Sequence, residues 1–116
     1  MNLRRIEIPC AEVAVAGLRY EPSHSRKNSV LVYSHGFTSG KHSMDLLASY
    51  LAVKGYPGVS FDVQGHKLGG TGGTLDTMEQ AVKNLRRAIR WSRENMEPAR
   101  LVLIGHSMGG ALSIAA

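Results

Sequence analysis

The stretch Gly105-His106-Ser107-Met108-Gly109 decides the fold of this chain. A short apolar run, 101–104, precedes it, and a segment of small residues, 110–116, follows it. This order predicts a strand, a tight turn and a helix, with Ser107 at the apex of the turn. The glycines on either side of the serine keep neighbouring backbones clear of the bend, so the hydroxyl is expected to stand exposed above the edge of a sheet.

Strand-like and helix-like segments alternate along the rest of the chain with short connections, which is typical of an α/β architecture with a largely parallel sheet. The first two segments, 3–8 and 12–20, are separated by Pro9 and a short turn, and we expect them to form an antiparallel pair. Near-continuous apolar runs predict strands that are buried on both faces. These runs are 29–34, 58–63 and 101–104.

Two helices are expected between these strands. Ser43 can cap a helix over 44–54, and Gly55 is placed to end it. A longer helix is expected to continue to about Met96. Its start is marked by a capping box, formed either by Thr77 with Gln80 or by Asp76 with Glu79.

The turn around Ser107 resembles the nucleophile elbow of the α/β-hydrolases. Ser34-His35-Gly36-Phe37 is similar to the His-Gly oxyanion loop of that family, and Asp62-Val63-Gln64-Gly65-His66 is similar to its Asp-x-Arg-Gly-His-Gly segment, with Gln64 in place of the arginine. The resemblance covers nearly all of the chain. It implies an α/β fold that is the amino-terminal half of an α/β-hydrolase, a mostly parallel sheet with flanking helices, ending just after the nucleophile elbow. Residues 1–116 would then form a partial α/β-hydrolase domain.

The resemblance also implies acyl transfer through a covalent serine ester. Ser107 Oγ would attack the carbonyl of a small carboxylic ester, and the backbone N–H groups of Phe37 and Met108 would stabilise the oxyanion. In this family of esterase-like and lipase-like enzymes the acid and then the histidine follow the serine, whereas this chain stops nine residues after Ser107. We therefore expect the chain by itself to be inactive or nearly so.

A non-catalytic role is the alternative hypothesis. A truncated, hydrolase-like scaffold would bind a partner, and a strand from that partner would complete the sheet beside 101–104. The elbow strand would otherwise be an exposed edge, so either a missing segment or a partner is expected to cover it. Ser107 would then be a plain helix-cap serine.

The remaining histidines and glycines do not predict a second site. His106 is not expected to act as the base for Ser107, because adjacent residues on a sharp turn project in different directions. His35 is expected to shape the oxyanion loop, and His24 and His42 are expected to lie on the surface. Neither a metal nor a cofactor is expected, since no pair of histidines has a supported ligand spacing and no glycine pattern fits a phosphate or dinucleotide loop.

Charge and cysteine content argue against several other classes. The formal net charge is +5, but the basic residues are mostly scattered, and their one cluster lies on the expected second helix opposite an apolar stripe. This pattern favours a solvated helix face over a nucleic-acid site. Cys10, the only cysteine, is expected to be a small packing residue. The basic cluster comprises Lys83, Arg86, Arg87, Arg90 and Arg93.

Acidic residues near the amino terminus bear on where the protein is located. Glu7 and Glu12 interrupt the apolar region that a signal peptide would need. No stretch approaches the roughly 18 apolar residues of a membrane-spanning helix. A cytoplasmic location is therefore expected.

Overall fold

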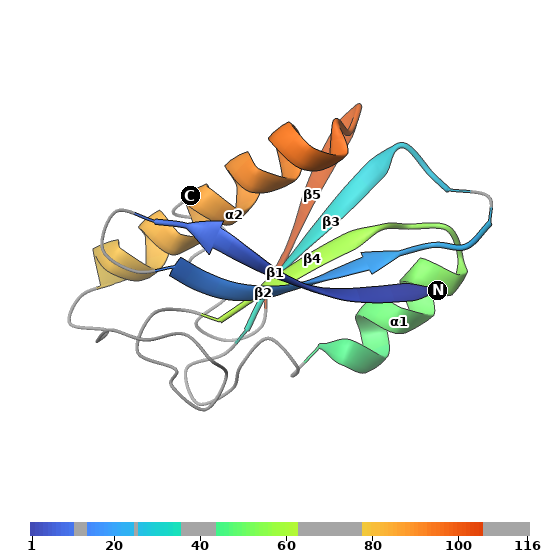
Figure 1. Cartoon of the computed structure of the whole chain (residues 1–116), viewed down its shortest axis with the longest axis horizontal. Coiled ribbons are helices and arrows are strands. Elements are labelled where there is room, and N and C mark those ends of the chain that lie inside the picture. Colours follow the sequence, from blue (N-terminus) through green and yellow to red (C-terminus); the bar gives the residue numbers. More distant parts are fainter. Residues whose placement is uncertain (11–13, 25, 36–43, 63–77, 106–116) are drawn as a thin grey trace.

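The computed structural model describes residues 1–10, 14–24, 26–35, 44–62 and 78–105. Within them, two strands come first, and strands and helices then alternate along the chain (Figure 1). The strands are β1 (Asn2–Pro9), β2 (Ala14–Glu21), β3 (Ser29–Ser34), β4 (Gly58–Phe61) and β5 (Arg100–Gly105), and the helices are α1 (Asp45–Val53) and α2 (Met78–Met96).

These strands form one five-stranded sheet in the order β1-β2-β4-β3-β5. β2 is antiparallel to both β1 and β4, whereas β3 lies between β4 and β5 and is parallel to both. The expected antiparallel pair at the start and the parallel arrangement after it are thus confirmed. Parallel strands need crossover connections. Helix α1 lies on the connection from β3 to β4, and α2 lies on the connection from β4 to β5.

The two helices cover opposite faces of the sheet, as Figure 1 shows. The apolar stripe of α2 packs on one face, where Leu85 and the side chains of β3 and β4 are buried. On the other face α1 packs through Ala48 and Ala52 against Tyr20 and Tyr33. The rings of these two tyrosines meet edge to face, with 6.3 Å between their centroids.

A residue with positive φ follows the carboxyl end of each helix. Gly55 has a φ of 101°, which confirms it as the residue that ends α1. Glu97, directly after α2, has a φ of 44° and precedes Pro98, which cannot continue a helix.

The N-cap of α1 differs from the expectation, because Met44 occupies the N-cap position without a side-chain hydrogen bond. Ser43 lies outside the described residues, as do Asp76 and Thr77, the first residues of the two capping boxes proposed for α2.

The expected burial of the third apolar run on both faces is wrong. Val102 in β5 is 38% exposed, and the strand alternates between exposed and half-buried positions. The physical reason is its place at the end of the strand order, where β5 pairs with β3 and no second described strand lies on its other side. The expectation of an exposed edge strand is therefore confirmed within the described part of the chain.

Candidate active site

The carboxyl ends of the three parallel strands meet at one edge of the sheet. Ser34, the last residue of β3, is the register partner of Phe61 at the end of β4 and of Gly105 at the end of β5. Ligands of open α/β sheets bind outside such carboxyl ends. The register therefore brings together the three points at which the candidate segments leave the sheet.

His35 follows β3 directly and is buried, with only 2% of its surface exposed. Its ring lies 6.5 Å from the ring of Phe61, centroid to centroid, at an angle of 53°. A buried imidazole held against a neighbouring strand fixes the direction in which the chain leaves the sheet. The loop that His35 is expected to shape, 36–43, lies outside the described residues, and that expectation stays a prediction.

Asp62 follows β4 and is fully buried. Its backbone N–H donates a 2.9 Å hydrogen bond to the carbonyl of Ala16, so β2 holds the end of β4 in place. Ser34, the register partner of Phe61, buries its hydroxyl without a hydrogen-bond partner among the described residues. Such a group is costly to bury, and the few found in native structures each need an explanation, of which a catalytic role is one.

The predicted nucleophile, Ser107, and the two predicted oxyanion donors, Phe37 and Met108, lie outside the described residues, as do His42, His66 and His106. What the structure describes is the sheet edge from which their segments continue. His24 is exposed, as expected.

Sequence reasoning gave Asp62 no role beyond membership of a motif. In the structure Asp62 is a buried carboxyl group at the candidate edge, with Ser34 at the end of the adjacent strand and His35 directly after it. The sequence does indicate the position of Asp62, because an acidic residue that directly follows a buried apolar strand must lie at the strand end. Periodicity does not report whether that side chain is buried, since burial depends on which strands lie beside it.

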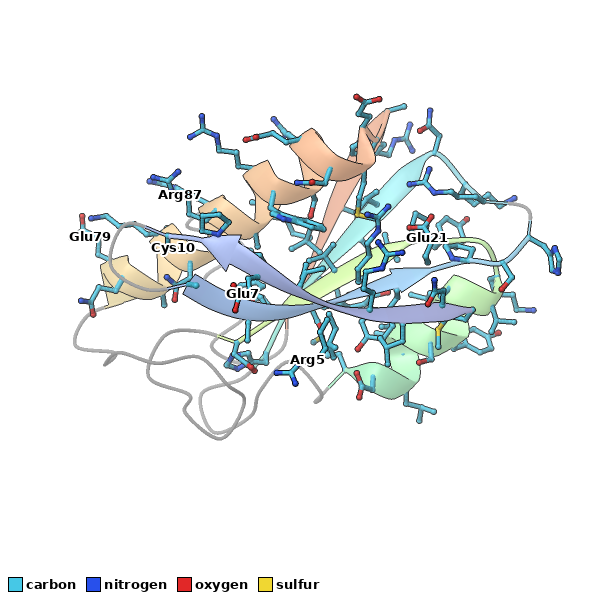
Figure 2. The ribbon with its side chains drawn as sticks, in the orientation of Figure 1. Arg5, Glu7, Cys10, Glu21, Glu79 and Arg87 are labelled. Carbon is cyan, nitrogen blue, oxygen red and sulfur yellow. The ribbon has the colours of Figure 1, made fainter. Side chains whose placement is uncertain are left out.

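The basic residues of α2 lie on its solvated face, as expected, because Lys83 and the four arginines of this cluster are all exposed. Arg90 Nε lies 3.0 Å from Glu94 Oε1, an ion pair between two residues four apart on the exposed face of the helix. Cys10 is half-buried beside this helix (Figure 2), and burial raises the pKa of its thiol, an effect that the positive charge of Arg87 opposes. These features are typical of a packing cysteine and not of a reactive one.

No helix in the described part of the chain has the length and apolar character needed to cross a membrane. Among the same residues, no group of three or more histidine, cysteine, aspartate or glutamate side chains is placed to hold a metal ion.

Comparisons with known proteins identify the family. A model of the family described as serine aminopeptidase, S33, matches residues 25–116. No curated protein matches the sequence.

Solved structures agree with this assignment. The chain superposes on the esterase Pf2001 of Pyrococcus furiosus with a TM-score of 0.83 and 25% identity, over 98% of this chain and 45% of that one. An α/β serine hydrolase homologue from Coxiella burnetii gives a TM-score of 0.82 at 20% identity, over 99% of this chain and 57% of that one. A serine hydrolase without a lid, XC6422 of Xanthomonas campestris, gives 0.81 at 18% identity, over 97% and 54%.

The chain spans about half the length of these structures. Its mixed sheet with two helices matches the amino-terminal part of an α/β-hydrolase fold, and the family model covers most of its length. The chain therefore belongs to the serine aminopeptidase S33 family of α/β-hydrolases.

Proposed function

We propose that this chain carries the nucleophile and the oxyanion hole of a serine hydrolase that acts on a carboxylic ester. One observation carries the proposal: Ser34 and Gly105 are register partners, so β3 and β5 end side by side. Phe37 comes three residues after Ser34, and Ser107 comes two residues after Gly105. The two strands from which these segments continue therefore end at the same edge of the sheet, which supports the proposal.

In the proposed reaction Ser107 Oγ attacks the ester carbonyl carbon and forms a new C–O bond, while its proton passes to a general base. The carbonyl oxygen becomes negatively charged and is stabilised by the N–H groups of Phe37 and Met108. Each such donor is worth roughly 3 to 4 kcal/mol of the barrier. The C–O bond to the alcohol then breaks, and the alcohol takes the proton from the base. Water hydrolyses the acyl-enzyme by the same steps in reverse.

Buried polar groups at this edge support the positioning of the oxyanion donor. His35 is packed against Phe61, so the backbone that leads to Phe37 starts from a fixed point. Donors that are fixed before charge develops need no reorganisation during the reaction. We assign His35 as a positioning residue.

The base and its acid partner are proposed to lie beyond Ser107 in sequence, in the order that the resemblance implies. On this proposal the 116-residue chain by itself lacks an activated serine. Loss of the triad base lowers turnover by about 10⁶-fold in subtilisin. The chain alone should therefore turn over a simple aryl ester about 10⁶-fold more slowly than the enzyme with its base.

Labelling with a fluorophosphonate, followed by peptide mapping, tests the proposal. The full product of the native reading frame should be labelled at Ser107 and should lose both labelling and esterase activity on Ser107→Ala. The matched control, Ser113→Ala, removes a hydroxyl from the same segment and should leave both unchanged. Absence of label at Ser107 in the full product would overturn the proposal and favour the alternative, a non-catalytic scaffold whose sheet a partner completes.

A further inference from the structure

The outer edge of β1 is a second free edge of the sheet, at the opposite end from β5. β1 pairs with β2 along its whole length, and no described strand lies on its other side. The amino-terminal ammonium group donates a 2.6 Å hydrogen bond to Ser23 Oγ, which holds the start of the strand. The unpaired N–H and C=O groups along such an edge are a template for pairing with another chain.

In an antiparallel strand the N–H and C=O groups of successive residues point alternately to the two sides, and this shows which residues of β1 direct their backbone groups to the free edge. The Asp62 N–H donates to the Ala16 carbonyl, so the backbone groups of Ala16 face β4. Those of its neighbour Gly17 then face β1, where Gly17 is the register partner of Ile6. Ile6 therefore directs its N–H and C=O toward β2, and Arg5 and Glu7 on either side of it direct theirs outward.

The outward-facing positions of β1 also share one face of the sheet, the face away from α2, since Ile6 and Ile8 pack into the core beneath that helix. Figure 2 shows Arg5 and Glu7 extending from β1 on this side. Both are exposed, and neither forms an ion pair with another described residue. The four positions on this face read, in order, Leu3, Arg5, Glu7 and Pro9.

This order is self-complementary when the strand is reversed. We propose that the β1 edge pairs with the β1 edge of a second copy of this chain, antiparallel, around a two-fold axis at Ile6. Arg5 then lies opposite Glu7 of the second copy, and Leu3 lies opposite Pro9. Opposite charges placed directly across an antiparallel pair contribute roughly 0.2 to 1 kcal/mol each. The two sheets join into one continuous sheet.

The charges of Arg5 and Glu7 favour a two-fold axis at Ile6 over an axis at an adjacent position of the strand. A two-fold axis at Arg5 would place that arginine opposite its own copy, and an axis at Glu7 would do the same for the glutamate. Like charges directly opposite one another are destabilising. An axis between two residues would match outward-facing positions with positions whose backbone groups face β2, so no ladder could form.

An apolar pair accompanies the charged pairs in this register. Leu3, which is 48% exposed, would be covered beside Pro9 of the second copy.

Sedimentation velocity over a range of concentrations tests the pairing. The wild-type chain should form dimers, and Arg5→Glu or Glu7→Arg should weaken the dissociation constant roughly 10- to 100-fold, because each turns two attractive contacts into repulsive ones. An equimolar mixture of the two variants should form heterodimers, since one edge is then acidic and the other basic. The double variant Arg5→Glu/Glu7→Arg should recover self-association.

Arg86→Glu is the matched control for Arg5→Glu, because it makes the same change of net charge at an exposed position of α2. It should leave the dissociation constant unchanged. Association through the β5 edge would be insensitive to all of these variants. A wild-type chain that stays monomeric, or one whose association survives Arg5→Glu, would overturn the proposal.

Cross-linking provides a second, independent readout. At the proposed axis the two Ile6 residues form a pair whose Cα atoms are about 4.5 Å apart, within the range that a disulfide can span. Ile6→Cys in a Cys10→Ala background should therefore give a disulfide-linked dimer on mild oxidation, whereas Arg86→Cys in the same background should not. Equal yields from the two variants would contradict the two-fold arrangement.

Discussion

The Tyr20 hydroxyl donates a hydrogen bond to Asp45 Oδ1 and so ties β2 to the first turn of α1. Burial and this carboxylate raise the pKa of Tyr20. Removing the hydroxyl with Tyr20→Phe should lower the free energy of unfolding by about 1 to 2 kcal/mol, because a bond to a charged acceptor is lost. Urea denaturation measures this. Tyr50→Phe, at an exposed position of the same helix, is the control and should change stability by less than about 0.5 kcal/mol.

Tyr33 should behave in the opposite way. Its hydroxyl is buried without a hydrogen-bond partner among the described residues. Tyr33→Phe removes this unsatisfied group while keeping the ring that packs on Gly58, and should raise the free energy of unfolding by about 1 kcal/mol. A destabilised variant in urea denaturation would show that the hydroxyl has a partner after all.

Alkaline pH provides a further test of the same tyrosine. Burial raises the pKa of Tyr33 from 10.0 to about 12. The unfolded chain therefore ionises this group first as the pH rises. The free energy of unfolding is unaffected by this ionisation below pH 10 and falls as the pH rises from 10 toward 12. The midpoint of urea unfolding should fall over this interval, and it should fall less steeply in Tyr33→Phe.

Gly17 is predicted to tolerate no side chain. A Cβ atom at this position would lie 2.8 Å from the backbone oxygen of Ser60 and 3.0 Å from Ile6 Cγ1. Strand β2 lies between β1 and β4, so the backbone cannot move aside. Gly17→Ala should cost about 1 to 3 kcal/mol of stability through overpacking. Ala14→Val, which adds carbon atoms at an exposed position of the same strand, should change the unfolding midpoint little.

The thiol of Cys10 should react slowly with disulfide reagents in the folded protein. Burial raises its pKa, and Arg87 is the charge that opposes this shift. The thiolate is the reactive form, so reaction with a disulfide reagent at pH 8 should be slower for the native chain than for the chain in urea. Arg87→Gln should slow the native reaction further. An unchanged rate in that variant would show that the arginine does not act on the thiol.

Much of the fold could be predicted from local patterns. The apolar runs located β3 and β5 to within a residue, and Gly55 marked the end of α1, because strand burial and helix termination leave their signals in neighbouring residues. The cap of α1 was predicted one residue early, at Ser43 instead of Met44, since capping depends on backbone angles that residue type only biases. The burial of β5 was predicted wrongly for a different reason. The sequence of an apolar strand does not depend on whether it lies in the middle of a sheet or at its edge. Val102 is exposed because β5 is an edge strand among the described strands.

The same division applies to the candidate site. The sequence by itself determined that a serine flanked by glycines follows an apolar strand, and that a histidine and an aspartate follow two others, because these are relations between adjacent residues. Only the tertiary structure decided that those strands are neighbours in the order β4-β3-β5 and end in register at Ser34, Phe61 and Gly105. Strand order arises from crossovers and hydrogen-bonded pairing between residues far apart in the chain, which no local pattern records.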